Sequence, residues 1–260
     1  MMIVFSDLDG TLLDHQTYDW QPARPALEQL QELGYPVVLV SSKTLPELAE
    51  LQQQMGLVHP VVAENGAAIH VPDGYFSEDA VANWESPARA ALQAAYEEVQ
   101  QAAGYDCQAF YELGVSGIVR ETGLTEERAR LANERAGSEP ILWRDSDTNR
   151  AAFEASMQAR GLRCVQGGRF LHLMGDTGKE DAVGQLMRAY ALKWCNEELI
   201  SVSLGDAPND LGMLAATDIA VIIPGKHQHP MHVTANNRVI RPDSPGPAGW
   251  NEAMMSLLSE

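Results

Sequence analysis

The stretch Met1-Met2-Ile3-Val4-Phe5-Ser6-Asp7-Leu8-Asp9-Gly10-Thr11 decides the fold class of this chain. Its first five residues are apolar and predict a short buried β-strand. Asp7 and Asp9 follow two residues apart, a spacing at which an extended chain turns both side chains to one side. Ligands bind at this end of the strands in an open α/β sheet. The stretch therefore predicts a strand that leads into a site.

Two carboxylates that face one ligand repel each other, by roughly 4 kcal/mol at about 4 Å and an effective dielectric of about 20. A bound cation, a shared proton or a covalent role for one of them would relieve this repulsion. The alternative is an Asx turn with a glycine after the strand, which serves only the backbone. We favour a catalytic site.

Apolar strands and amphipathic helices alternate at both ends of the chain. Helices are predicted over residues 22–33, 45–55, 179–193, 207–216 and 250–258. Strands are predicted over residues 37–40, 61–63, 199–204 and 219–223. This alternation is typical of parallel strands joined by right-handed helical crossovers. We expect an α/β core, a doubly wound parallel (Rossmann-like) sheet built from residues 1–84 and 175–260.

The middle of the chain mixes short strands with helices and does not continue the regular alternation. It predicts an inserted α+β cap domain over residues 85–174. Helices are expected over residues 86–103, 125–136 and 147–160, and strands over residues 107–111, 139–143, 162–166 and 169–174. Turn-rich stretches mark both boundaries, at Pro72-Asp73-Gly74 and at Gly175-Asp176-Thr177-Gly178.

The composition narrows the class of partner. The chain has 260 residues and a formal net charge of −18, from 36 acidic and 18 basic residues. This charge disfavours nucleic acid and anionic membrane surfaces as partners. No apolar run is long enough for a membrane span, and the apolar start is too short for a signal peptide. We therefore expect a cytoplasmic protein in which any anionic substrate meets locally placed cations.

The cysteines and clustered histidines add no strong metal signal. Widely spaced cysteines without CxxC pairing predict free thiols, at Cys107, Cys164 and Cys195. The clustered histidines are His227, His229 and His232. Their spacing is compatible with a metal ion, but the neighbouring prolines and glycine favour a solvated loop.

Two further motifs lie where a strand meets a helix. Ser41-Ser42-Lys43-Thr44 follows a predicted strand, and hydroxyls, backbone N–H groups and a lysine at a helix start bind phosphate. The alternative is that Thr44 only caps the helix. Lys179 lies in the first turn of a helix, where a cation is electrostatically unfavourable, and it is either exposed or compensates the carboxylates.

A fourth motif, Gly205-Asp206-Ala207-Pro208-Asn209-Asp210, follows another predicted strand. Oxygen ligands of this kind suit Mg²⁺, which takes a few carboxylates and keeps waters. The alternative is an aspartate N-cap with an acidic first turn. Because all four motifs lie at strand ends or the helix starts that follow, they converge on one rim of the sheet.

The order Asp-x-Asp, Ser, Lys, Gly-Asp-x-x-Asn-Asp resembles that of the haloacid dehalogenase superfamily of phosphotransferases, and the insertion resembles the α+β cap of its sugar-phosphatase branch. Other stretches resemble the mannosyl-3-phosphoglycerate phosphatase family: Ser41-Ser42-Lys43-Thr44, Glu64-Asn65-Gly66-Ala67, Trp143-Arg144-Asp145-Ser146-Asp147 and Gly167-Gly168-Arg169-Phe170. The first of these replaces the Thr-Gly-Arg common in the branch. The resemblance extends over nearly the whole chain and is weakest in the cap.

The resemblance implies a role for each core residue. Asp7 would be the nucleophile that forms an aspartyl-phosphate, and Asp9 the general acid and base. Mg²⁺ would be held by Asp7, the backbone carbonyl of Asp9 and Asp206, with Asn209 and Asp210 close to it. The groups expected to hold or orient the substrate are Thr11, Ser41, Ser42, Lys43 and Lys179.

The expected substrate is a small phosphorylated sugar or glycerate, and its far end must meet the cap. A glycerate carboxylate suits a bidentate guanidinium, which makes Arg169 and Arg144 candidates, with Arg135 a weaker one. Arg169 is favoured because the glycines beside it let backbone approach closely. Glu64 and Asn65 are expected to bind sugar hydroxyls.

Three alternatives stay open. The same chemistry could serve glucosyl-3-phosphoglycerate or sugar phosphates in general, since epimeric sugars differ by one hydroxyl orientation. A sugar phosphomutase would instead depend on a bisphosphate activator. A non-enzymatic descendant would have lost Asp7, Asp9, Lys179 or Asp206, all of which are present. The sequence also leaves open whether the protein is a monomer or a homodimer.

Overall fold

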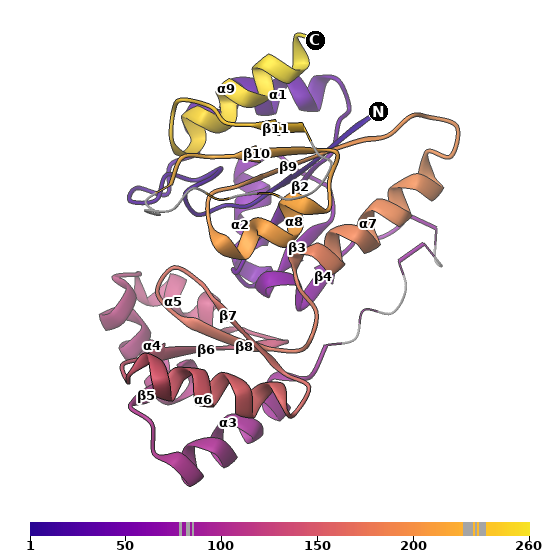
Figure 1. Cartoon of the computed structure of the whole chain (residues 1–260). Coiled ribbons are helices and arrows are strands. Elements are labelled where there is room, and N and C mark those ends of the chain that lie inside the picture. The colour runs from indigo at the N-terminus through magenta and orange to yellow at the C-terminus, as the bar shows by residue number, and fades with distance from the viewer. Residues whose placement is uncertain (78–79, 82–83, 85, 226–230, 232, 234–237) are drawn as a thin grey trace.

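The computed structural model describes residues 1–77, 80–81, 84, 86–225, 231, 233 and 238–260. The protein has two parts, a core that carries both termini and a cap formed by the middle of the chain (Figure 1). Each part has its own sheet and its own apolar cluster. None of the described helices is both long and apolar enough to cross a membrane.

The core sheet has the strand order β11-β10-β9-β1-β2-β3-β4. Its strands are β1 (Met2–Ser6), β2 (Val37–Val40), β3 (Val61–Ala63), β4 (Ala68–His70), β9 (Ile200–Gly205), β10 (Ile219–Ile222) and β11 (Arg238–Ile240). All neighbouring pairs are parallel except β4, which runs antiparallel to β3. The chain builds outward from β1 in one direction and from β9 in the other, so the order reverses between these two central strands. Ligands of doubly wound sheets bind at such a point.

Helices cover both faces of the core sheet, as the alternation along β1 requires. Val4 packs in the cluster that contains α1 (Arg24–Glu32), α2 (Leu45–Met55) and α9 (Gly246–Leu258). Ile3 and Phe5 pack in the cluster that contains α7 (Lys179–Lys193) and α8 (Leu211–Ala215). Short 3₁₀ turns complete the core: η1 (Gln21–Ala23), η2 (Glu64–Gly66) and η3 (Pro208–Asp210). The doubly wound α/β core is confirmed.

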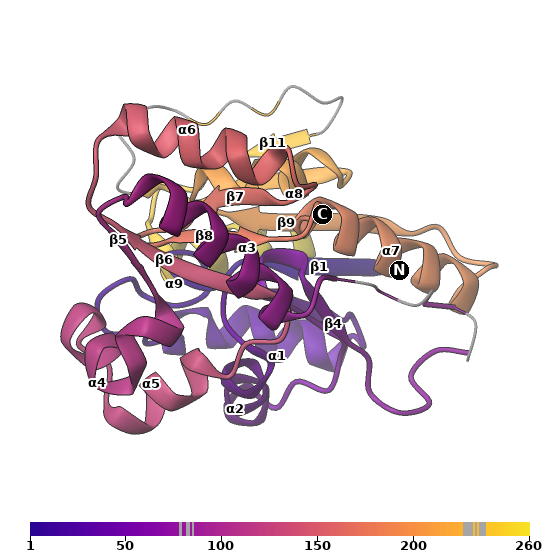
Figure 2. The ribbon, with the colours of Figure 1, turned by 90° about the horizontal axis from the view of Figure 1, so that it is seen from below.

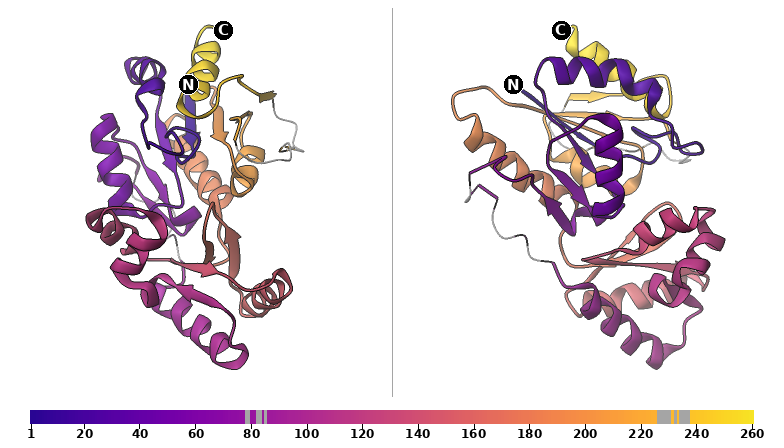
Figure 3. Two further views of the ribbon diagram at one scale, coloured as in Figure 1. Left: turned by 90° about the vertical axis from the view of Figure 1, so that its left-hand side faces the viewer. Right: turned by 180° about the vertical axis from the view of Figure 1, so that it is seen from behind.

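The cap is an antiparallel sheet of order β5-β6-β8-β7 with helices on one face. Its strands are β5 (Cys107–Ala109), β6 (Ser138–Trp143), β7 (Arg163–Gln166) and β8 (Leu171–Met174). The helices α3 (Arg89–Ala103) and α6 (Asp147–Gln158) pack on the face that points away from the core (Figures 1 and 2). The helices α4 (Phe110–Thr122) and α5 (Glu126–Asn133) form a second cluster that approaches α2 of the core (Figure 3). The α+β character of the cap is confirmed, and residues 85 and 174 remain its proposed limits.

The structure departs from the expected elements in several places. The strand expected over residues 107–111 ends at Ala109, because Phe110 begins α4, a helix the sequence did not indicate. Two edge strands, β4 and β11, were not expected, and α9 begins at Gly246 rather than near residue 250. The cysteines are free thiols, as predicted. The histidine cluster (His227, His229 and His232) lies outside the described residues.

Candidate active site

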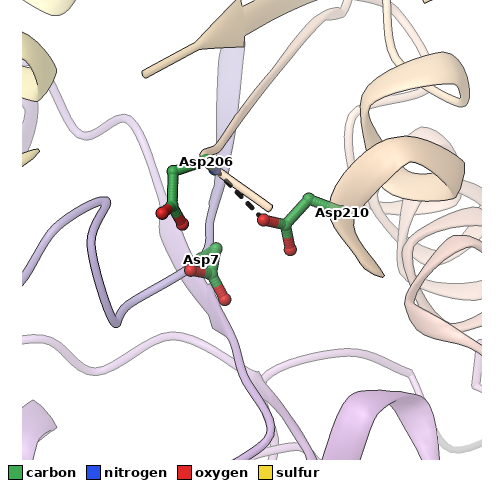
Figure 4. A group of neighbouring side chains, drawn as sticks. All are labelled: Asp7, Asp206 and Asp210. Carbon is green, nitrogen blue, oxygen red and sulfur yellow. Dashed lines mark hydrogen bonds between the residues drawn. The ribbon is translucent and has the colours of Figure 1, made fainter. Parts of the chain in front are cut away.

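The carboxyl ends of β1 and β9 bring three aspartates together. The two strands pair in parallel with Ser6 beside Leu204, so Asp7 and Asp206 leave the sheet side by side. Asp210 reaches the same place from the end of η3. One carboxylate oxygen from each of the three lies within 4.8 Å of the others, and all three side chains are buried (Figure 4). We call these residues the aspartate trio.

Two glycines make this close approach possible. A Cβ atom on Gly10, whose φ is +92°, would lie 2.5 Å from Oδ2 of Asp206. A Cβ atom on Gly205 would lie 2.5 Å from Cβ of Asp210. Any other residue at either position would push an aspartate away. The glycines of the first and fourth motifs therefore have a steric function, which the sequence alone did not reveal.

A single buried lysine bridges two members of the trio. Lys179 lies in the first turn of α7 and its side chain is 1% exposed. Its Nζ donates to Oδ1 of Asp7 at 2.6 Å and to Oδ1 of Asp210 at 2.7 Å. Burial alone would lower the pKa of Lys179, but Asp210 and Asp7 outweigh burial and raise it. The lysine is therefore charged and compensates the carboxylates, and the alternative of an exposed side chain is wrong.

One lysine does not neutralise three buried carboxylates. Burial and the neighbouring Asp210 raise the pKa of Asp7 to about 8, against the opposing effect of Lys179. Burial and Asp210 likewise raise the pKa of Asp206 to about 7. A hard divalent cation with oxygen ligands relieves such repulsion. Within the described part of the chain, the trio is the acidic group whose oxygens lie close enough together for a metal ion.

These pKa values predict how the metal-free protein responds to pH. Asp7 and Asp206 have higher pKa values in the folded protein than in the unfolded chain, so folding is favoured where they are protonated. The free energy of unfolding therefore falls as the pH rises through about 7 to 8. Mg²⁺ at about 100 times its Kd adds about 2.7 kcal/mol. We expect this gain to be larger at about pH 9 than at about pH 6, where protons compete with the metal.

Melting temperatures with Mg²⁺ and with chelator across this pH range measure both effects. The matched control is Asp73→Asn, which removes an exposed carboxylate outside the trio, from the loop after β4. A melting temperature that responds neither to metal nor to pH would contradict a metal site at the trio.

Asp9 lies at the edge of the trio rather than within it. Its Oδ2 accepts a hydrogen bond from Nζ of Lys43 at 2.9 Å. Its Oδ1 is buried and has no hydrogen-bond partner among the described residues. Asp9 also contributes to the raised pKa of Asp206, so the two carboxylates share one rim. The period-two prediction that Asp7 and Asp9 face one region agrees with this placement.

The second motif caps a helix, as one of its alternatives expected, and also places a lysine at the rim; phosphate binding stays a prediction. The hydroxyl of Thr44 accepts from the backbone N–H of Glu47 and caps α2, while the Glu47 side chain accepts from the backbone N–H of Thr44. Lys43 reaches past this cap to Asp9, and the buried Ser41 hydroxyl accepts from the backbone N–H of Lys43 at 3.3 Å. The loop thus starts α2 and also supplies a cation to the rim.

The remaining core residues of the prediction also lie at this rim. Thr11 donates through its hydroxyl to Oδ1 of Asp206 at 3.2 Å, so it orients a member of the trio. Asn209 donates through Nδ2 to Oδ1 of Asn65 at 3.4 Å. Asn65 is 2% exposed, and its Nδ2 has no partner among the described residues. The carbonyl of Ser42 accepts from Nη1 of the cap residue Arg135 at 3.2 Å.

Glu64 connects the core to the cap. Its carboxylate accepts hydrogen bonds from the backbone N–H groups of Ala136 and Gly137, at 2.9 and 3.3 Å, and from the hydroxyl of Ser138 at 2.6 Å. Glu64 is 1% exposed and holds a φ of +54°, which is unusual for a residue other than glycine. These three hydrogen bonds therefore hold the start of β6 in the cap against the core.

The three cap arginines occupy different places. Arg135 lies between cap and core, where Nη1 donates to Ser42 and to the hydroxyl of Ser138. Arg144 and Arg169 are exposed, and both contact Glu121. Arg144 pairs with the Glu121 carboxylate, and Arg169 donates a hydrogen bond to the Glu121 backbone carbonyl. The structure therefore brings Arg135 to the core, and it places the other two together at the end of α4.

Comparison with known proteins identifies the class to which this fold and site belong. The family described as haloacid dehalogenase-like hydrolase matches residues 4–136, which carry the first two motifs. The chain belongs to this family, as a phosphatase of the haloacid dehalogenase superfamily. It is similar to a glucosyl-3-phosphoglycerate/mannosyl-3-phosphoglycerate phosphatase of Methanococcoides burtonii. The identity is 33% over 270 aligned positions, covering 99% of this chain and 97% of the relative.

Solved structures share the whole architecture, cap included. A phosphatase of this superfamily from Bacteroides thetaiotaomicron matches with a TM-score of 0.69 and 17% identity, over 100% of this chain and 96% of its own. The sucrose-phosphatase of Synechocystis sp. PCC6803 matches with a TM-score of 0.65 and 18% identity, over 98% and 97% of the two chains. At these identities the likeness concerns the fold.

Proposed function

We propose that the protein is a Mg²⁺-dependent phosphomonoester hydrolase that works through an aspartyl-phosphate on Asp7. The observation that carries the proposal is the lysine-bridged aspartate trio, with Asp9 beside it at the ends of β1 and β9. A nucleophile, a second carboxylate and a buried cation at one rim are what phosphoryl transfer requires, since it depends on positioning and charge neutralisation.

The residues divide the reaction into two displacements. In the first, Asp7 attacks phosphorus while the ester bond breaks, and Asp9 gives its proton to the departing alcohol oxygen. In the second, Asp9 takes a proton from a water molecule, which attacks the same phosphorus and releases phosphate and free Asp7. Lys179 and Ser41 hold phosphoryl oxygens throughout. A magnesium ion, held by the trio, the Asp9 carbonyl and Asn209, would neutralise charge and orient the phosphoryl group.

We propose mannosyl-3-phosphoglycerate as the main substrate, which would yield mannosylglycerate and phosphate. The name of the Methanococcoides burtonii relative supports either the mannosyl or the glucosyl substrate. Phosphate release from a panel of phosphorylated metabolites that includes both, in Mg²⁺ and in excess chelator, tests the proposal. Full activity in chelator would overturn the metal-dependent mechanism. Activity that needs a bisphosphate activator and releases little phosphate would indicate a phosphomutase.

Arg169→Ala tests the cap side of this proposal. If Arg169 binds the glycerate carboxylate, its loss removes a charge-assisted hydrogen-bonding pair that contributes about 1.5–3 kcal/mol. We therefore expect the KM for mannosyl-3-phosphoglycerate to rise about 10- to 100-fold, with little change for p-nitrophenyl phosphate. Arg144→Ala, at the same surface, should show a smaller shift of the same kind.

The matched control for both variants is Arg120→Ala, which removes another exposed arginine that pairs with Glu121. Equal effects on the two substrates would remove Arg169 from carboxylate binding.

A further inference from the structure

His172 is a buried histidine on the face of the cap sheet that looks toward the core. In β8, Leu171 and Leu173 point into the apolar cluster with α3 and α6. Alternate residues of a strand point to opposite faces, so His172 and Met174 point the other way. Because α3 and α6 cover the far side of the sheet, this other face is turned to the core (Figures 1 and 2).

The imidazole of His172 has an unused hydrogen-bonding atom. The residue is 6% exposed, and its Nδ1 is buried without a partner among the described residues. Buried polar atoms are nearly always paired, so an unpaired one needs an explanation. The oxygen Oδ1 of Asp9 and the Nδ2 of Asn65, both at the rim, are unpaired in the same way. Unpaired atoms on the rim and on the facing cap sheet point to a molecule that binds between them.

Two cations act on His172, one from each part of the protein. Burial, Arg135 of the cap and Lys179 of the core lower its pKa to about 3. The ring is therefore neutral at physiological pH, with one nitrogen that donates and one that accepts. Lys179 is the residue that holds Asp7, which places His172 on the cap side of the aspartate trio.

Gly167, the first residue of the Gly-Gly-Arg-Phe stretch of the cap, lies against the imidazole of this histidine. A Cβ atom on Gly167 would lie 2.8 Å from Nε2 of His172, which is closer than real contacts allow. Gly167 does not have a left-handed φ, so this position needs a glycine for space alone. A Cβ atom on the adjacent Gly168 would meet nothing within 4 Å. Gly167 therefore leaves room for the imidazole to keep its orientation.

We infer that His172 hydrogen-bonds through Nδ1 to an oxygen of the alcohol part of the phosphate ester, and so helps to determine substrate specificity. The inference rests on the proposed function, which places a phosphomonoester at Asp7. The phosphoryl oxygens are held from the core by Lys179 and Ser41, so the cap faces the group on the other side of the ester bond. A carboxylate or hydroxyl in that group gives Nδ1 the partner that the protein does not supply.

The experiment compares substrates that differ in the alcohol part. For His172→Leu we expect the KM for mannosyl-3-phosphoglycerate to rise about 10- to 100-fold, while kcat and KM for p-nitrophenyl phosphate change less than about twofold. His172→Gln, which keeps a donor and an acceptor, should recover part of the loss. 3-Phosphoglycerate and glycerol 3-phosphate differ only in that a hydroxymethyl group replaces the carboxylate. A KM increase confined to 3-phosphoglycerate therefore assigns the carboxylate, and an equal increase with both assigns a hydroxyl.

Two glycines give a matched pair of variants. Gly167→Ala should shift the KM in the same direction as His172→Leu, because the new methyl group displaces the ring. Gly184→Ala, in α7, where a Cβ atom would come no closer than 3.8 Å to another atom, should leave both substrates unchanged. Equal losses on all substrates, or no change in any His172 variant, would overturn the inference. A wild-type protein that hydrolyses none of the substrates would overturn the proposed function instead, and melting temperatures identify a variant that fails to fold.

Discussion

Asp7→Asn should lower kcat for every phosphomonoester by at least about a thousandfold. The amide is nearly the same size as the carboxylate but does not attack phosphorus, so a covalent route is closed whatever the alcohol part is. The effect should therefore be as large for p-nitrophenyl phosphate as for a glycosyl phosphoglycerate, in contrast to variants of the cap. Rapid-quench mass spectrometry should find a phosphoryl group on the wild-type protein during turnover and none on the variant.

Loss of activity in Asp7→Asn should not reflect loss of the fold. The variant removes one of three buried like charges, and burial already raises the pKa of Asp7 to about 8 in the metal-free protein. A neutral side chain at this position resembles the protonated state, so the melting temperature in chelator should be close to that of the wild type. A variant that keeps more than about a tenth of the activity would show that Asp7 is not the nucleophile.

The sequence predicts the core well because its strands are buried on both faces. Such strands are continuous apolar runs, and the helices between them have apolar residues at helical spacing. Both patterns can be recognised within a short segment of sequence. Helix α4 was missed because Gly114, with a φ of +61°, and Gly117 interrupt its stripe. The edge strand β11 was missed because it is short and largely exposed, so burial leaves no periodic signal in it.

The core of the site was also predictable, because parallel strands end at one rim. Asp7, Asp206 and Lys179 are distant in sequence, but each follows a strand end or starts the next helix, so topology alone brings them together. The role of Lys179 was open from the sequence, and it became clear only from its bonds to two aspartates.

The cap side of the site was not predictable in the same way. Glu64 was expected to bind a sugar, and in the structure its carboxylate accepts three hydrogen bonds from the cap. The sequence does not indicate His172 as a site residue, because a histidine between two leucines in a strand has no local signal for a binding site. The surroundings of both residues depend on how the cap lies on the core. The spacing of residues along the sequence does not reveal such a long-range arrangement.

Lys179→Met should have the other large effect, and it should reduce both stability and activity. The lysine is the buried cation between Asp7 and Asp210, and methionine fills similar space without charge. Removing one partner of a buried ion pair costs about 3–5 kcal/mol. We expect this loss in urea denaturation of the metal-free protein, together with a fall in kcat of at least about a hundredfold. Arg188→Met, in the same helix, is the control because Arg188 is exposed and its side chain bonds Gln185 of that helix.

The pH dependence distinguishes an electrostatic loss in Lys179→Met from poor packing. Without the lysine, which lowers the pKa values of Asp7 and Asp206, these two values rise further, so protonation compensates the missing cation at low pH. The destabilisation should therefore be larger at about pH 9 than at about pH 6, whereas a packing defect would be independent of pH. Mg²⁺ should recover most of the stability, because it replaces the lost positive charge. If activity stays low when stability is recovered, Lys179 also acts on the phosphoryl oxygens; if both recover together, its role is limited to the aspartates.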